Sequence, residues 1–232
     1  SERALLKKRL MQNAHVVLMS PRRYGKSSLI AQFTHEQKIP FVAIDLLPAT
    51  SENYVKNAII DGVSSLLGPN MPRLKKAKAA ILGHFSTMNP ALELSAFGQK
   101  LKFTPTDNTP EETIMKALLS LDKAAKELKK KLIFVMDEFQ QIANLSNSHS
   151  LEACIRHAVE RSKHVFYIFS GSNRTLLEEM FKNADRPLYH LCDEIKINRI
   201  DKNDYYSFII KAANANWWQS FNYLIIKKIL TL

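Results

Sequence analysis

The chain has 232 residues, of which 46% are hydrophobic and 24% are charged. This composition is typical of a folded domain and excludes intrinsic disorder, because enough apolar surface is available to offset the lost conformational entropy. A membrane-spanning helix is not expected, since no apolar run approaches the roughly 20 residues that cross a bilayer. The net charge of +11 favours a polyanionic partner such as nucleic acid, acidic lipid or a phosphate-bearing ligand.

The positive charge is concentrated in the first part of the chain. Residues 1–100 contain fourteen Lys and Arg against six Asp and Glu, whereas residues 101–232 contain nineteen against sixteen. Basic clusters occupy residues 7–9, 22–26 and 73–78. A solvated helix face explains the first and last of these clusters as well as a nucleic-acid contact does, so nucleic acid stays an alternative partner.

Two further features bear on the setting of the protein. Only two cysteines, Cys154 and Cys192, are present, which is too few for a disulfide framework and predicts a reducing cytoplasm. The chain opens without Met or a signal-type apolar segment and ends inside the apolar pattern of residues 229–232. We therefore expect a parent chain that continues in both directions.

Strand and helix patterns alternate along most of the sequence. Short apolar runs predict buried strands, in chain order, at residues 15–19, 41–46, 132–136, 165–169 and, more weakly, 194–197. Helical periodicity between them predicts helices near residues 3–12, 26–37, 52–67, 110–130, 150–162 and 174–183. Apolar strands separated by helices indicate a parallel sheet covered on both sides, which is an α/β fold.

The domain boundaries follow from breaks in this alternation. Residues 91–103, with Gly98 near their centre, interrupt it and predict a β-hairpin insertion. After Asp201 only helical periodicity remains. The sequence thus predicts an α/β domain over residues 1–200 and a partial helical domain over residues 201–232.

The first predicted strand leads into a loop and a helix with the pattern of a phosphate-binding P-loop. The loop and the helix start consist of Ser20, Pro21, Arg22, Arg23, Tyr24, Gly25, Lys26, Ser27 and Ser28. A helix that begins here directs free backbone N–H groups and its positive dipole end at a phosphate, and Gly25 lets the backbone close around it. We expect Lys26 to neutralise β- and γ-phosphate charge and Ser27 to offer its hydroxyl to Mg²⁺.

The loop departs from the usual pattern at Ser20, which stands where the first glycine belongs. Serine costs little there if the backbone is extended and more if φ is positive, so the substitution bears on the affinity for the nucleotide. Arg22 and Arg23 either add to the anion-binding field or are unpaired surface side chains.

The predicted strand at residues 132–136 ends in the adjacent acids Asp137 and Glu138 and resembles a Walker B motif. Asp137 is expected to hold Mg²⁺ through water, because Mg²⁺ gives up its hydration reluctantly. Glu138 is expected to accept a proton from the water that attacks the γ-phosphate, or to orient that water. An apolar run that ends in two acids is common and indicates little by itself. Together with the P-loop upstream it indicates a nucleotide-binding site.

The next predicted strand, at residues 165–169, is followed by Ser170, Gly171, Ser172 and Asn173. Polar groups at the carboxyl end of a parallel strand lie where ligands bind in open α/β folds. Ser172 or Asn173 therefore hydrogen-bonds the γ-phosphate or the attacking water, or else caps the helix that begins at Arg174. Both interpretations stay open from the sequence.

Together these phrases resemble the prokaryotic and archaeal ATPase group of the AAA+ superfamily, close to the signal-transduction (STAND-type) ATPases. The resemblance rests on residues 21–29, 136–140 and 169–172, and on residues 186–189 followed by residues 195–197. It implies a P-loop NTPase fold of the AAA+/ASCE type, with a five-stranded parallel sheet in the order 5-1-4-3-2, flanking helices and a helical lid that is only partial here.

The same resemblance implies ATP with Mg²⁺ and a sensor at Ser172 or Asn173. It also implies an arginine that acts on the nucleotide of a neighbouring subunit, and Arg186 is the candidate for this role. A surface arginine at a helix end explains Arg186 equally well. A second copy of the chain, or another protein, is thereby an expected partner.

Three functional interpretations follow. The leading one is a Mg²⁺-dependent ATPase that uses hydrolysis as a conformational switch, with Lys26, Ser27 and Asp137 binding MgATP and Glu138 assisting cleavage. A GTPase is disfavoured because no N-K-x-D motif occurs. The alternatives are a nucleic-acid-binding module with a regulatory or weakly active ATP site, and a scaffold that binds ATP but hardly hydrolyses it.

Overall fold

A computed structural model describes residues 2–68, 109–199, 205–209 and 211–212. The chain divides into two units, Ser1–Ile197 and Asn198–Leu232. In the second unit residues 205–209 and 211–212 are helical. The β-hairpin predicted at residues 91–103 and most of the helical segment predicted over residues 201–232 lie outside the described residues.

Strands and helices of the first unit alternate as the sequence predicts. In chain order the elements are α1 (Glu2–Gln12), β1 (Val16–Met19), α2 (Lys26–Gln37), β2 (Phe41–Asp45), α3 (Glu52–Leu67), α5 (Pro110–Glu127), β3 (Leu132–Asp137), the 3-10 helix η2 (Phe139–Asn144), α6 (Ser148–Glu160), β4 (Val165–Gly171), α7 (Arg174–Lys182) and β5 (Asp193–Lys196). Each described strand coincides with a predicted one. The short helix η2, directly after the two acids, was not predicted.

The strands form one five-stranded parallel sheet in the order β2-β3-β4-β1-β5. This is the predicted order 5-1-4-3-2 read from the opposite edge, so the fold class is confirmed. Strand β4 lies between β1 and β3, with Met19 opposite Gly171 and Met136 opposite Phe169. Because all three strands are parallel, their carboxyl ends meet at one edge of the sheet.

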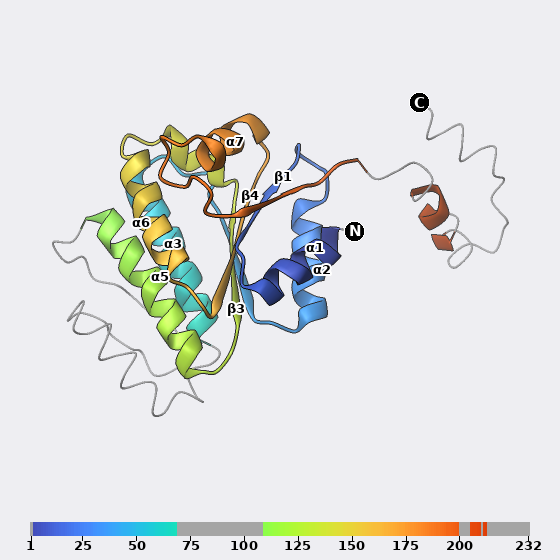
Figure 1. Ribbon diagram of the computed structural model, residues 1–232, viewed down its shortest axis with the longest axis horizontal. Helices are drawn as coiled ribbons and strands as arrows, with labels where there is room; N and C mark the ends of the chain where they lie inside the picture. The colour runs from blue at the N-terminus through green and yellow to red at the C-terminus, as the bar shows by residue number, and fades with distance from the viewer. Residues whose placement is uncertain (1, 69–108, 200–204, 210, 213–232) are drawn as a thin grey trace. The chain divides into compact units, whose positions relative to one another are not determined.

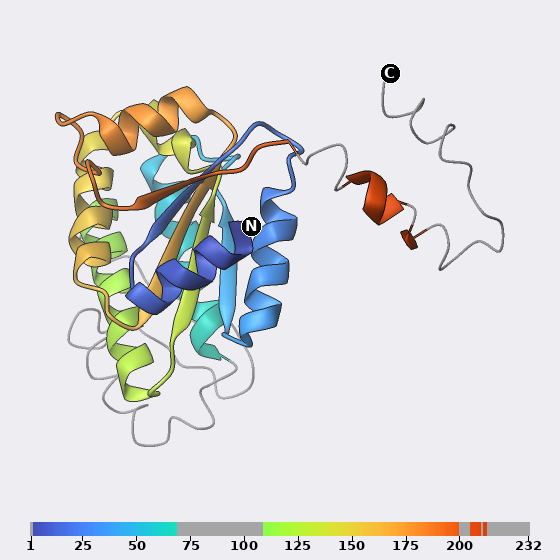
Figure 2. The same ribbon diagram turned by 45° about the vertical axis from the view of Figure 1, so that its right-hand side comes forward.

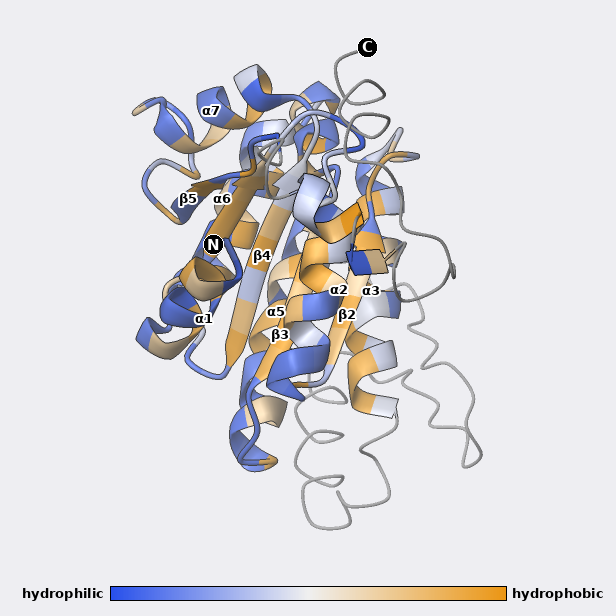
Figure 3. Cartoon of the chain, turned by 90° about the vertical axis from the view of Figure 1, so that its right-hand side faces the viewer, coloured by the Kyte–Doolittle hydropathy of each residue, from blue (hydrophilic) through white to orange (hydrophobic). Residues whose placement is uncertain are grey.

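Helices cover both faces of the sheet, with α3, α5 and α6 on one side and α1 and α2 on the other (Figure 1; Figure 2 shows the same layers from a second angle). Successive strand residues alternate between the two cores: Val17 and Met19 pack on the α3–α5–α6 side, whereas Val16 and Leu18 pack against α1 and α2. Strands β3 and β4 are accordingly apolar along most of their length (Figure 3). This double burial is what fixes a parallel sheet with helices on each face.

Helix boundaries follow from local capping. Ser51 accepts a hydrogen bond from the backbone of Tyr54 at the start of α3, and Thr109 accepts one from Glu112 at the start of α5, where Pro110 takes the first helical position. No helix within the described residues has both the length and the apolarity that crossing a membrane requires.

Candidate functional site

The loop after β1 ends at a glycine with left-handed backbone geometry. Gly25 has φ 81° and ψ 19°, which a residue with a side chain adopts only at a cost, and α2 begins at the next residue. Among the described residues no side chain caps the first turn of α2, and that turn contains no acidic residue. The free N–H groups and the positive end of the helix dipole are therefore available to an anion.

Lys26 lies over this loop and is only 7% exposed. Its Nζ donates to the carbonyl oxygens of Ser20 at 3.3 Å and Pro21 at 3.5 Å. Because a buried ammonium needs hydrogen-bond partners, these carbonyls hold the charge beside the start of α2. The loop thus places a cation next to free N–H donors, as binding of a polyphosphate requires.

Ser20, which replaces the expected glycine, is buried at 1% exposure. The residues of the loop that adopt positive φ are Arg23, at 66°, and Gly25, and Ser20 is not among them. Its hydroxyl donates to the carbonyl of Pro21 at 3.2 Å. The serine therefore meets no strain of the kind that positive φ would impose.

The remaining loop residues are mostly open to solvent. Pro21, Arg22, Arg23, Ser27 and Ser28 are exposed, and Tyr24 is half-buried. Among these side chains, Arg22 reaches across to β4, where its Nε donates to the hydroxyl of Ser172 at 3.4 Å. The contact joins the P-loop to the polar segment after the neighbouring strand.

Strand β3 ends at Asp137, and its carboxylate faces the end of β4. Asp137 Oδ1 accepts a hydrogen bond from the hydroxyl of Ser170 at 2.5 Å and one from the backbone N–H of Glu138 at 3.0 Å. Glu138 adopts a left-handed backbone conformation with φ 51°. This turn interrupts the strand geometry between the two acids.

The carboxylate of Glu138 is held by two donors. Its Oε2 accepts from Ser172 Oγ at 2.6 Å and from Gln140 Nε2 at 2.6 Å. Burial raises the pKa of Glu138, but the hydrogen bonds from Ser172 and Gln140 and the charge of Lys26 outweigh it, so the pKa lies below its ordinary value. Glu138 is therefore ionised at neutral pH, as a proton acceptor must be.

The residues at this edge also fit a magnesium ion. Asp137 offers a carboxylate, and Ser27 offers an exposed hydroxyl in the first turn of α2. Over the described residues no group of three or more His, Cys, Asp or Glu side chains could hold a metal ion. Mg²⁺ needs no such group, because it uses one or two carboxylates together with water and phosphate oxygens.

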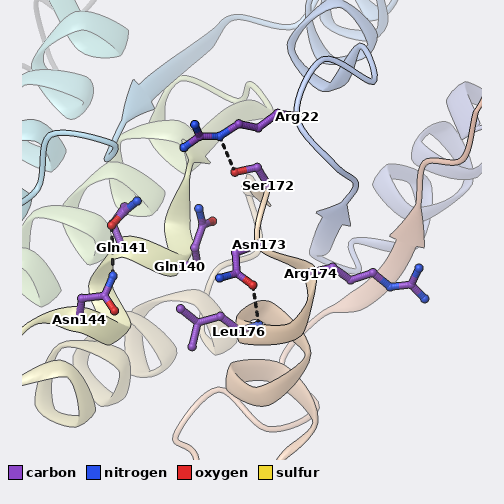
Figure 4. A pocket seen from close by; sticks show the side chains of 8 residues that line it. All are labelled: Arg22, Gln140, Gln141, Asn144, Ser172, Asn173, Arg174 and Leu176. Carbon is purple, nitrogen blue, oxygen red and sulfur yellow. Dashed lines mark hydrogen bonds between the residues drawn. The ribbon is translucent and has the colours of Figure 1, made fainter.

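A polar pocket of about 460 Å³ lies beside the P-loop, between η2 and the start of α7 (Figure 4). Its lining consists of Arg22, Gln140, Gln141, Asn144, Ser172, Asn173, Arg174 and Leu176. Arg22 and Ser172 are bonded to each other on one side, and Gln141 Oε1 accepts from Asn144 Nδ2 at 3.2 Å on another. The pocket, two of whose lining residues bond Glu138, is thus lined mainly by amides, a hydroxyl and guanidinium groups.

The two sensor candidates have different contacts. Asn173 Oδ1 accepts from the backbone N–H of Leu176 at 3.1 Å and caps α7 (Figure 4). Ser172 instead bonds the Glu138 carboxylate and receives the contact from Arg22. Of the pair, Ser172 is the residue that the structure brings next to the acid and the P-loop.

Arg186 lies apart from these groups, in the segment after α7. Its guanidinium donates to Glu152 Oε1 on α6, and Nη1 lies 3.3 Å from Nε2 of His149. The side chain of Arg186 is 11% exposed and that of Glu152 is 0% exposed. Arg186 is therefore not a surface side chain, and action on a neighbouring subunit's nucleotide would require this ion pair to open.

No protein-family model matches the chain, and no curated protein matches it. Solved structures do: the Walker-type ATPase Paby2304 of Pyrococcus abyssi superposes with a TM-score of 0.69 at 20% identity, over 100% of this chain and 61% of that one. The chain has the fold of a P-loop ATPase. Two Aeropyrum pernix proteins also match: ORC2 in ADPNP–ADP complexes (TM-score 0.53, 13% identity, 91% of this chain and 50% of that one) and ORC1 in complex with DNA (0.51, 11%, 92% and 48%).

In this P-loop ATPase fold, the structure brings together most of the residues that the sequence singled out. The P-loop, Asp137, Glu138 and Ser172 meet at the carboxyl edge of the sheet. Two contacting residues received no role from the sequence: Ser170, which holds Asp137, and Gln140, which holds Glu138. A signal existed for Ser170, which is a polar residue at the end of an otherwise apolar, buried strand, but not for Gln140, which shares η2 with Gln141 and Asn144.

Proposed function

We propose that the chain is a Mg²⁺-dependent ATPase domain of the AAA+ superfamily, close to the STAND-type ATPases. One observation carries the proposal: β4 lies between the strand that leads into the P-loop and the strand that ends in two acids, and its polar end touches both. Ser170 bonds Asp137, and Ser172 bonds Glu138 while receiving Arg22 from the P-loop. The loop cation, the acids and a hydroxyl sensor thus share one edge.

Each residue has a defined role in this proposal. The N–H groups at the start of α2 and the Lys26 ammonium bind the phosphates, while Asp137 and Ser27 hold Mg²⁺. The bound ion would neutralise charge on the β- and γ-phosphates. Glu138, which is ionised, accepts the proton of the attacking water or orients that water.

The switch function in the proposal rests on the chain of contacts from the P-loop to α7. Arg22 bonds Ser172, and the next residue, Asn173, caps α7. A bound γ-phosphate that attracts Arg22 and Ser172 would shift these side chains and, through Asn173, the start of α7. Hydrolysis removes the γ-phosphate and would let them return. A helical lid over residues 201–232, a partner subunit reached by Arg186 and a cytoplasmic location belong to the same proposal.

Two variants test the ATPase assignment directly. Lys26→Ala should abolish ATP binding, because the phosphates lose their buried cation. Glu138→Gln should still bind ATP but lose turnover by about 10²-fold or more, the usual contribution of a positioned proton acceptor. The exposed Glu127→Gln on α5 is a matched control. Equal phosphate release by wild type and Glu138→Gln, with ATP binding intact, contradicts the assignment of Glu138.

A second candidate function, nucleic-acid binding, is favoured by a basic cluster at the opposite edge of the sheet. Exposed cations gather where α5 and α6 end and β3 and β4 begin, namely Lys123, Lys126, Lys129, Lys131, Arg161 and Lys163. The acids beside them are fewer: Glu127, Glu160, which pairs with Arg156, and Asp122, which accepts from the backbone of Lys163. An exposed cluster in which cations outnumber acids attracts a phosphate backbone.

Titration of labelled duplex DNA at two salt concentrations tests this second candidate. Binding through the cluster predicts a steep fall of affinity with salt, and the triple variant Lys126→Gln, Lys129→Gln, Lys163→Gln should flatten the salt slope by about three ions. The double variant Lys7→Gln, Lys8→Gln on α1 serves as a comparison. An unchanged slope in the triple variant removes the cluster as a nucleic-acid site.

A further inference from the structure

Gln140 is a buried polar side chain between the ends of β3 and β4. It lies in η2 and is 3% exposed. Its Nε2 donates to Glu138 Oε2 at 2.6 Å, whereas its Oε1 has no hydrogen-bond partner in the part of the chain that the structure describes. A buried amide with an unmet acceptor is costly, so its place in the fold needs a reason beyond packing.

The neighbouring strand leaves room for this amide through the absence of a side chain. A Cβ at Gly171 would lie 1.9 Å from Gln140 Oε1 and 3.0 Å from Leu177 Cδ1. Gly171 is not among the residues with positive φ, so its backbone does not require glycine. The glycine is needed for space, and the space is occupied by the Gln140 amide.

We infer that Gln140 is a positioning residue for Glu138. Its amide, which has room because residue 171 is glycine, holds one carboxylate oxygen of Glu138 so that the other faces the attacking water. The inference rests on the proposed ATPase function. Gln140 and Ser172 both donate to Oε2, from η2 and from the end of β4, so the carboxylate is held from two sides. Both side-chain donors bond Oε2 and neither bonds Oε1, so Oε1 is the oxygen that we assign to the attacking water.

The residue next in sequence shows that this contact is particular to Gln140. Gln141 has the same side chain on the same short helix, and its Oε1 accepts from Asn144 at 3.2 Å. It is half-buried rather than buried and makes no hydrogen bond to either acid of the site in the described structure. Gln141 is therefore a matched control for the loss of an amide from η2.

Three variants separate positioning from packing. Gln140→Met keeps the length and bulk of the side chain but removes the N–H donor, and Gln141→Met makes the same change next to it. Gly171→Ala leaves Gln140 in the sequence but places a Cβ where its amide lies. If Gly171→Ala does not fold, Gln140→Met carries the test alone, since its volume is close to that of glutamine.

The first measurement needs no turnover. The pKa of the Glu138 carboxylate is followed by carbon-13 NMR of glutamate-labelled protein, with Glu138→Gln to assign the signal. Gln140→Met removes a donor to the charged form, so the pKa of Glu138 should rise, as it should in Gly171→Ala and not in Gln141→Met. An unchanged pKa in Gln140→Met overturns the inferred contact.

The second measurement is steady-state MgATP hydrolysis against pH. We expect kcat to fall about tenfold or more in Gln140→Met and Gly171→Ala, because small displacements of a catalytic group are costly. The KM for ATP should stay within about twofold, and the acidic limb of the kcat profile should move to higher pH. Unchanged kcat in Gln140→Met overturns the positioning role. Absence of turnover in the wild type overturns the ATPase proposal instead, and the NMR titration then decides on the contact alone.

Discussion

The guanidinium of Arg186 donates a hydrogen bond to Glu152 Oε1, and both side chains lie inside the protein. Glu152 Oε2 and Arg186 Nε have no hydrogen-bond partner among the described residues. Burial raises the pKa of Glu152 to about 7, since the opposing effect of the Arg186 charge is smaller. Near neutral pH this ion pair is therefore only partly charged, and it ties α6 to the segment that follows α7.

Loss of Arg186 should destabilise the fold in a pH-dependent way. The pKa of Glu152 is higher in the folded chain than in the unfolded one, so its contribution to stability is full below about pH 4.5 and is lost as the pH rises through about 7. Arg186→Met removes the compensating cation and should cost about 3–5 kcal/mol at pH 8, and less at about pH 5.5, where Glu152 is protonated. Urea unfolding at the two pH values measures the difference.

The double variant Glu152→Gln, Arg186→Met controls for the unpaired charge, and it should recover much of the stability at pH 8. If Arg186 only stabilises the fold, Arg186→Met lowers the free energy of unfolding and leaves the turnover per folded chain unchanged. A different outcome is a wild-type turnover per chain that rises with protein concentration, together with an Arg186→Met variant that keeps full stability but loses this rise. Arg186 then acts on a neighbouring subunit's nucleotide, as the family resemblance implies.

The glycine and the serine of the P-loop should respond in opposite ways to substitution. Ser20 does not have positive φ, so Ser20→Gly relieves no strain and should leave the ATP affinity within about twofold, with a stability loss of about 0.5–1 kcal/mol. Gly25 has φ 81°, so Gly25→Ala should cost about 1–2 kcal/mol and weaken ATP binding. Calorimetric titration and urea unfolding measure both effects.

Gly68→Ala is the control for this comparison, because a Cβ there meets nothing within 4 Å among the described residues and the backbone is right-handed helical. It should be neutral or slightly stabilising. A gain of tenfold or more in ATP affinity for Ser20→Gly would show that the missing first glycine limits binding after all.

The predictable part of this fold is the part that local sequence determines. Apolar runs located β1, β3 and β4 because these strands are buried along nearly their whole length, and the P-loop was predicted because Gly-Lys-Ser lies where the loop after β1 leads into α2. Whether Ser172 or Asn173 caps α7 depends on side-chain geometry at the end of β4, so the sequence left it open. The contact between Arg186 and Glu152 joins segments that no periodicity relates.

Gln140 and Gly171 show the same limit more sharply. Each is part of a sequence segment that resembles the ATPase group, but the sequence gives no reason for a glycine at residue 171. The reason is the position of an amide from another strand's end, 1.9 Å from a hypothetical Cβ. A clearance of this kind exists only after β3 and β4 have paired.

Ser170 should tune the magnesium dependence of the site. It is fully buried, and its hydroxyl donates to Asp137 Oδ1. Ser170→Ala frees that oxygen from its orienting bond, and the Mg²⁺ concentration for half-maximal turnover should rise by up to about tenfold. Ser120→Ala is the matched control, since Ser120 is a buried serine whose hydroxyl has no hydrogen-bond partner within the described structure. An equal Mg²⁺ response in the two variants contradicts a role for Ser170.

His15 should make the fold sensitive to acid. It is 8% exposed, its Nε2 donates to the carbonyl of Val159 at 2.9 Å, and its Nδ1 accepts from the backbone N–H of Tyr167 at 3.2 Å. Burial lowers the pKa of His15, although the Val159 carbonyl and the charge of Asp122 oppose the shift. The neutral ring fits both partners, whereas a protonated Nδ1 would face the N–H of Tyr167.

Because the pKa of His15 is lower in the folded chain than in the unfolded one, its contribution to stability is present above about pH 6.5 and is lost as the pH falls through the folded pKa. This dependence is opposite in sign to that of Glu152. Below about pH 6.5 the free energy of unfolding should fall by up to about 1.4 kcal/mol per pH unit from this group. His15→Gln should reduce that slope, and the exposed His35→Gln should not. Parallel pH profiles for wild type and His15→Gln in urea unfolding would assign the acid sensitivity to another group.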